Sequence, residues 1–133
     1  MSIESLKGNE EFVFVYGTLM SGYGNNRLMT DVNAWKVCGA TIDGTLYDLN
    51  YFPGVKLGTG HTVHGEVWAV PVEGLASLDR LESEGFLYNR KKTEVYVDGK
   101  KAPQKTWVYE IIEQRLGIKS KVMPEGDWRK KQN

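Results

Sequence analysis

The chain has 133 residues, and its seventeen basic residues balance seventeen acidic ones, so the formal net charge is zero. A chain of this length can enclose one hydrophobic core, and we expect a single domain over residues 1–133 with its core at about 12–129. The even charge balance argues against a general affinity for nucleic acid or anionic membranes. The one cysteine, Cys38, excludes an internal disulfide and any multi-cysteine metal site.

The first strand is expected at residues 12–16, where a continuous apolar run is typical of a strand buried on both faces. A glycine-rich loop follows, and Asn25 is a good N-cap for a short helix at residues 26–30. Turns are expected at Asp43-Gly44 and Pro53-Gly54. The strands expected between these signals cover residues 35–42, 45–49, 54–57 and 62–70.

Helical spacing returns at residues 72–82, and strands resume at 88–97 and 106–112. Residues 98–101, Asp-Gly-Lys-Lys, look like the hairpin loop between those two strands. Many strands with only two short helices predict an α+β fold, in the form of a small mixed β-barrel or a strongly curled sheet.

The expected strand at residues 62–70 has two different faces. Val63, Val67 and their neighbours on one face are apolar, whereas Glu66 and Trp68 lie on the other face with His64. The apolar face belongs to the core. The second face fits either the lining of a cavity or a wet outer surface, and the pattern does not choose between them.

The segment that starts at Tyr16 and continues through Gly17, Thr18 and Leu19 is the first candidate for chemistry. Glycines let the backbone approach a ligand closely, and the helix behind them adds unpaired N–H donors. Such a loop can hold a carboxylate, a phosphate or a developing oxyanion. A glycine-rich turn that only connects a strand to a helix explains the same residues equally well.

Glu82 is the second candidate, because helical spacing places it between Leu75 and Leu78 on the buried stripe. A carboxylate that points into an apolar face is costly unless it is paired or lines a cavity. Desolvation would raise its pKa toward the range of a base at neutral pH. If the helix instead ends before residue 82, Glu82 is solvated. Asp79, on the flank of the same face, is expected to form an ion pair with Arg80 or Arg90.

Other sites are excluded by residue spacing. His61 and His64 are three apart in an expected strand, so their side chains point to opposite faces and make a poor metal site. The polar N-terminus is unlike a signal peptide, and the apolar run at 12–16 is far too short to cross a bilayer. The basic C-terminal end reads as a solvated tail. We therefore expect a cytoplasmic protein with no nucleic acid or membrane partner.

Several motifs, taken together, resemble the γ-glutamyl cyclotransferase superfamily, and in particular its compact AIG2-like branch that holds the γ-glutamylamine cyclotransferases. Each motif is weak alone, but their order and spacing over residues 12–129 are specific. They are Tyr16-Gly17-Thr18-Leu19, then Tyr23-Gly24-Asn25-Asn26, Val63-His64-Gly65-Glu66-Val67-Trp68, Leu78-Asp79-Arg80-Leu81-Glu82, Tyr88-Asn89-Arg90 and Gly126-Asp127-Trp128-Arg129. Ser83 departs from the pattern, which usually has glycine after the glutamate.

The resemblance implies that Glu82 is the catalytic acid and base in the conversion of a γ-glutamyl amine or amide to 5-oxoproline and a free amine. It implies that Tyr16, Gly17, Thr18, Leu19 and Tyr88 bind the substrate. We expect no cofactor and no metal, and we expect a monomer or weak homodimer. A non-catalytic binding module for an amino-acid-like or anionic small molecule is the alternative.

Overall fold

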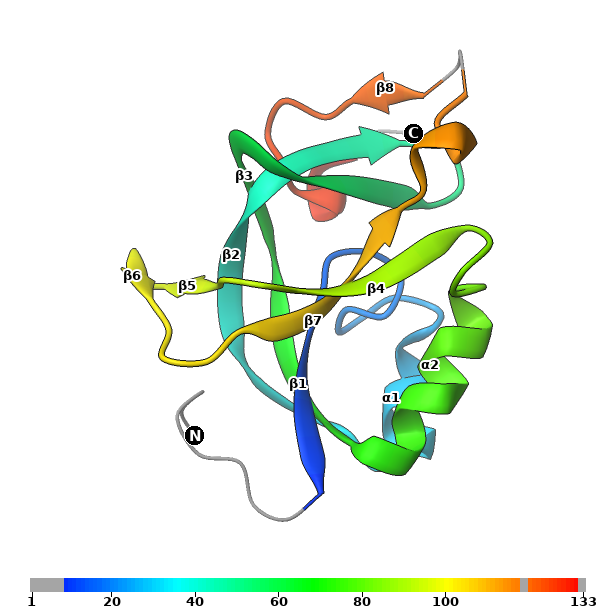
Figure 1. Cartoon of the computed structure of the whole chain (residues 1–133), viewed down its shortest axis with the longest axis vertical. Helices are drawn as coiled ribbons and strands as arrows, with labels where there is room; N and C mark the ends of the chain where they lie inside the picture. The colour runs from blue at the N-terminus through cyan, green and yellow to red at the C-terminus, as the bar shows by residue number, and fades with distance from the viewer. Residues whose placement is uncertain (1–8, 118–119, 132–133) are drawn as a thin grey trace.

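The structure is a computed structural model, and it describes residues 9–117 and 120–131; the polar segment before residue 9 and the last two residues of the basic tail lie outside that part. Eight strands form one sheet in the order β4-β7-β1-β3-β2-β5-β6, with β8 paired to β2 (Figure 1). The strands are β1 (Glu10–Val15), β2 (Trp35–Asp48), β3 (Pro53–Pro71), β4 (Tyr88–Thr93), β5 (Tyr96–Val97), β6 (Lys100–Lys101), β7 (Thr106–Ile111) and β8 (Lys121–Val122).

Two short α-helices lie together at one end of the curled sheet (Figure 1). They are α1 (Asn26–Asp31) and α2 (Leu75–Leu81), and the short 3-10 turns are η1 (Val72–Gly74), η2 (Glu113–Arg115) and η3 (Trp128–Lys130). β1 runs antiparallel to β3 and parallel to β7, so the sheet is mixed. The predicted α+β fold, a strongly curled mixed sheet with two short helices, is confirmed. No helix in the described residues is long and apolar enough to span a bilayer.

The strands β2 and β3 are longer than predicted, because each joins two expected strands, and the two expected turns are wrong. Asp43-Gly44 lies inside β2, and the pairing partner on β3 jumps there from Thr62 to Leu57, so the irregularity lies in β3. A Cβ on Gly44 would lie 2.7 Å from the carbonyl oxygen of Lys56, so the glycine permits close strand contact and not a turn. Pro53-Gly54 opens β3, and the reversal comes just before it, where Leu49 N–H donates to the Phe52 carbonyl at 3.0 Å.

The strand predicted at residues 88–97 divides into two. β4 ends at Thr93 and pairs with β7, whereas β5 pairs with β2 and forms a hairpin with β6. Asp98 and Gly99, with φ angles of 53° and 80°, make the two-residue turn of that hairpin. The predicted loop was therefore too long by the two residues that form β6.

Asn25 does not cap α1 with its side chain, contrary to the prediction. Its amide Nδ2 donates instead to Thr18 Oγ1 at 2.8 Å, and so ties the start of α1 to the loop that precedes it. The second helix is also shorter than predicted, since residues 72–74 form the 3-10 turn η1 and α2 stops at Leu81.

The core lies inside the curl of the sheet, where Val63, Val67 and Ala69 are fully buried, as predicted for that face of β3. The other face of β3 is also covered at two positions: Glu66 and Trp68 are 3% and 7% exposed. The residues after β1 cover that face, because Ser21 contacts Glu66. Neither of the two sequence alternatives, cavity lining or wet surface, describes this covered carboxylate.

Candidate active site

One cavity of about 260 Å³ brings together segments that are far apart in the sequence. Its walls come from the end of β1 and the residues after it, the start of β3, the end of α2, and from β4 and β7. The residues that line it are Phe14, Val15, Tyr16, Gly17, Thr18, Leu19, Asn25, Phe52, Pro53, Leu81, Glu82, Leu87, Tyr88 and Tyr109. Every site residue expected from the sequence therefore lies on this cavity.

Glu82 is the C-cap of α2, directly after the last helical residue. The helix thus ends before residue 82, yet the carboxylate is not in open solvent, because the side chain is half-buried and lines the cavity. Burial raises the pKa of Glu82 from the ordinary 4.5 to about 7. Within residues 9–117 and 120–131, its carboxylate has no hydrogen-bond or ion-pair partner. It can therefore both accept and donate a proton near neutral pH.

Residue 83 follows Glu82 in an unfavourable backbone conformation. Ser83 has a φ of 49°, in the left-handed region that favours glycine. The glycine that the resemblance leads one to expect at this position would adopt that conformation without a Cβ. The turn after Glu82 therefore holds a serine in a conformation that glycine adopts more readily.

The loop of residues 17–24, loop 17–24, contributes Gly17, Thr18 and Leu19 to the cavity lining. Within the described part of the chain, no hydrogen bond uses the N–H groups of Gly17, Thr18 or Leu19 as donors. The loop does make internal bonds, such as Met20 N–H to the Gly17 carbonyl at 3.0 Å. Gly17, Thr18 and Leu19, whose N–H groups have no partner in the described residues, therefore line the same cavity as the half-buried Glu82.

Gly17 is required by a close contact and not by a positive φ. A Cβ at this position would lie 2.7 Å from Cγ of Pro53, across the cavity wall. Any side chain on residue 17 would therefore push against the first residue of β3. The glycine lets the end of β1 and the start of β3 approach each other beside the free N–H groups.

Three buried tyrosines surround Glu82, and their hydroxyls are all engaged. Tyr16 donates to the Tyr109 carbonyl at 2.6 Å, and Tyr88 donates to the Pro53 carbonyl at 2.6 Å. Burial is the main cause that raises the pKa of each tyrosine, and the nearby Glu82 carboxylate adds to it. The rings of Tyr16 and Tyr88 therefore form walls, while their neutral hydroxyls fix the backbone behind them. The Tyr88 hydroxyl, bonded to the Pro53 carbonyl, makes no hydrogen bond to Glu82.

Asp79 contacts Arg90, one of its two expected partners, with Arg90 Nε 2.8 Å from Asp79 Oδ1. Tyr109 donates from its hydroxyl to the same Asp79 oxygen at 2.7 Å. The guanidinium of Arg90 also lies 4.4 Å from the centre of the Trp107 ring. This network joins α2, β4 and β7 directly behind Glu82, and so fixes the end of the helix.

Sequence reasoning missed Tyr109, Phe52, Leu81 and Leu87 as cavity residues. Tyr109 gives no local signal, since an aromatic residue in an apolar strand is ordinary core. Leu81, the last residue of α2, lines the cavity although it is 40% exposed. No three His, Cys, Asp or Glu side chains in residues 9–117 and 120–131 are grouped as a metal site would require.

Comparison with known proteins agrees with this geometry. Residues 13–130 match the family described as gamma-glutamyl cyclotransferase, AIG2-like. The chain is 36% identical over 117 residues to the gamma-glutamylcyclotransferase family protein YtfP of Escherichia coli K12, covering 87% of this chain and 94% of YtfP. It is 33% identical over 109 residues to bovine gamma-glutamylaminecyclotransferase, covering 73% of this chain and 63% of the bovine protein.

Solved structures share the fold. A uropathogenic E. coli-specific protein superposes with a TM-score of 0.73 at 26% identity, covering 91% of this chain and 94% of that one. An AIG2-like protein from mouse superposes with a TM-score of 0.67 at 26% identity, covering 77% and 78% of the two chains. The chain therefore belongs to the AIG2-like γ-glutamyl cyclotransferase family, as an enzyme of that type.

Proposed function

We propose that this enzyme converts a γ-glutamyl amine or amide to 5-oxoproline and a free amine, with Glu82 as its general acid and base. The observation that carries the proposal is the half-buried Glu82 carboxylate, with a pKa of about 7, in one cavity with Gly17, Thr18 and Leu19, whose backbone N–H groups have no partner in the described residues. The names of the E. coli and bovine relatives support the reaction class.

The chemistry needs one group that moves a proton twice. The α-ammonium of the substrate gives a proton to Glu82, and the α-amino nitrogen then attacks the γ-carbonyl carbon of the same molecule. The bond from this carbon to the departing nitrogen breaks, and that nitrogen takes the proton back from Glu82. The ring nitrogen loses its second proton to water, and the released amine takes up a proton from water. A carboxyl group with a pKa of about 7 is close to equally ready for both transfers at neutral pH.

The loop donors serve the same reaction by holding charge. N–H groups without a protein partner can bind the substrate α-carboxylate or the oxyanion that develops on the γ-carbonyl. Because nucleophile and carbonyl are parts of one molecule, the enzyme has mainly to fold the substrate into its cyclic shape. Tyr16, Tyr88 and Tyr109 supply rigid walls for that shape. The reaction as written consumes no cofactor and needs no metal.

The test is direct detection of product. The purified enzyme would be incubated with a γ-glutamyl alkylamine, a γ-glutamyl dipeptide and glutathione, and 5-oxoproline would be measured by mass spectrometry. We expect product with at least one of them. Glu82→Gln, which keeps the size of the side chain, is the matched control and should lose roughly a hundredfold or more of the rate.

Two results would contradict the proposal. Equal product with the wild type and Glu82→Gln would remove the role of Glu82. Binding of γ-glutamyl compounds without any 5-oxoproline would favour the alternative, a non-catalytic binding module. A cytoplasmic location and a monomer or weak homodimer remain predictions for this enzyme.

A further inference from the structure

Glu66 is a buried carboxylate that does not line the cavity, and the proposed reaction does not use it. It lies in the middle of β3, opposite Val15 of β1 on one side and Gly39 of β2 on the other. Only 3% of the residue is exposed. A buried carboxylate on a central strand is costly unless several donors surround it, so its contacts indicate its purpose.

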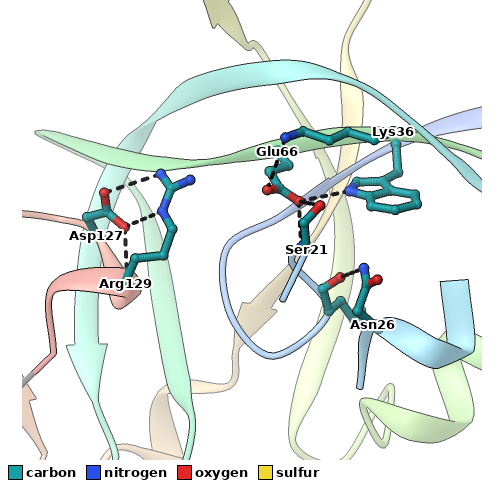
Figure 2. Close-up of polar contacts among 8 residues, drawn as sticks. Ser21, Asn26, Lys36, Glu66, Asp127 and Arg129 are labelled. Carbon is teal, nitrogen blue, oxygen red and sulfur yellow. Dashed lines mark hydrogen bonds and ion pairs between the residues drawn. The ribbon is translucent and has the colours of Figure 1, made fainter. Parts of the chain in front are cut away.

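Those contacts converge on one residue of loop 17–24. Ser21 donates to Glu66 Oε1 from its backbone N–H at 2.9 Å and from its hydroxyl at 3.3 Å. The indole Nε1–H of Trp68 donates to the same oxygen at 3.1 Å. Lys36 Nζ lies 3.4 Å from the other oxygen, and Figure 2 shows the Glu66 carboxylate held between Lys36 and Ser21.

The bonds to Ser21 are the hydrogen bonds that join loop 17–24 to the sheet in the described residues, and Leu19 and Met20 of the same loop are buried in the core. Among the described residues, the other hydrogen bonds of this loop stay inside it or run to the start of α1. Asn25 Nδ2 to Thr18 and Asn26 Nδ2 to the Leu19 carbonyl, both at 2.8 Å, are examples (Figure 2 shows Asn26). Ser21 itself is exposed, so without Glu66 its N–H would be solvated by water. Loss of Glu66 would therefore release the loop at Ser21, while the buried Leu19 and Met20 still hold it to the core.

We propose that Glu66 is a positioning residue, which holds loop 17–24 so that the free N–H groups of Thr18 and Leu19 face the substrate. This inference rests on the proposed function. Only the buried Met20 separates Ser21 from Leu19, so we expect a shift of Ser21 to reach those donors through the backbone. A small misplacement of catalytic donors can reduce a rate by up to about a hundredfold.

The chain offers a matched control in Glu110 of β7, a second buried carboxylate on the sheet. It is 7% exposed, accepts the backbone N–H of Leu57 at 2.9 Å, and lies 2.7 Å from Lys91 Nζ. Glu110 thus resembles Glu66 in burial and in having a backbone donor and a lysine. It contacts neither the cavity nor loop 17–24.

The experiment compares Glu66→Leu, Glu66→Gln, Glu110→Leu and Glu110→Gln by kcat/KM for 5-oxoproline release and by amide hydrogen exchange. Assays are run at a temperature at which all four variants are folded. We expect Glu66→Leu to lose about tenfold or more in kcat/KM, and Glu66→Gln, which keeps an acceptor for Ser21, to recover part of it. Exchange should become faster in loop 17–24 for the Glu66 variants only. Both Glu110 variants should stay within about twofold of the wild type in kcat/KM.

The two readouts separate this inference from the proposed function. If the wild type releases no 5-oxoproline, the reaction is wrong, but exchange in loop 17–24 still tests the link to Glu66. Unchanged exchange in that loop overturns the inference, as does faster exchange with an unchanged kcat/KM. If Glu66→Leu does not fold, Glu66→Gln against Glu110→Gln decides by the same two measurements.

Discussion

Ionised Glu82 should lower the free energy of unfolding at neutral and alkaline pH, and removal of its charge should restore that free energy. Its pKa is 4.5 in an ordinary environment and about 7 in the folded protein. Each tenfold difference in proton affinity is worth about 1.4 kcal/mol, so ionised Glu82 destabilises the fold by about 3 kcal/mol. The folded state holds the proton more tightly than the unfolded chain. Stability is therefore lost as the pH rises above 4.5, and the loss levels off above about 7.

Glu82→Gln has no such dependence, so the stability difference between the variant and the wild type should grow with pH. From pH 5 to pH 9 we expect the variant to gain about 2.5 kcal/mol on the wild type, which is roughly 9 °C in Tm for a chain of this length. Comparing two pH values cancels the constant cost of a buried amide.

The assay is urea denaturation or thermal unfolding of both proteins at pH 5, 6, 7, 8 and 9. Glu113→Gln, at an exposed position in η2, is the control and should run parallel to the wild type. If Glu82→Gln also runs parallel to the wild type over this range, Glu82 is not desolvated, and the reasoning about its pKa fails.

Four further outcomes follow from the same cavity. The kcat/KM for 5-oxoproline release should rise with the ionisation of Glu82 and be half-maximal near pH 7; a midpoint near 4.5 would contradict its burial. Ser83→Gly should stabilise the fold by about 0.5–1 kcal/mol in urea denaturation, since φ of 49° suits glycine, and a destabilised variant would argue against that strain. Gly17→Val should lower kcat/KM more than its loss of stability explains, because its Cβ meets Pro53 at 2.7 Å; a purely stability-linked loss would count against the cavity wall. Leu81→Lys should leave the free energy of unfolding nearly unchanged, because residue 81 is 40% exposed. It should reduce kcat/KM for substrates whose amine side carries a positive charge, relative to substrates whose amine side is uncharged. An unchanged substrate preference would show that the amine side does not pass residue 81.

Sequence reasoning reached the fold class and the placement of Glu82 because both depend on local patterns. The density of strand signals predicted the curled sheet, and the leucine spacing of α2 placed Glu82 toward the interior even though the helix stops one residue earlier. Glycine signals were less reliable. Gly44 permits close contact between β2 and β3 and does not form a turn, because a glycine serves either purpose and only the partner strand decides which.

The residues that the sequence could not assign are those whose surroundings come from distant segments. Nothing near Glu66 in the sequence reveals that Ser21, 45 positions earlier, covers it. Tyr109 enters the cavity because β7 lies between β4 and β1, and strand order of this kind depends on pairings across the whole chain. The resemblance to the family identified the motif at residues 78–82, but the contacts behind it required the structure.

The position of β1 between β3 and β7 has a consequence for how the enzyme matures on the ribosome. β1 finds its antiparallel partner once β3 has been made, but its parallel partner, β7, is synthesised about ninety residues after it. Until then Tyr16 has no Tyr109 carbonyl to bond, and Asp79 has no Tyr109 hydroxyl. Pairings so distant along the chain are slow to form. The cavity is therefore one of the last parts of the protein to take shape, and a nascent chain that stops before β7 lacks the wall that would make it an enzyme.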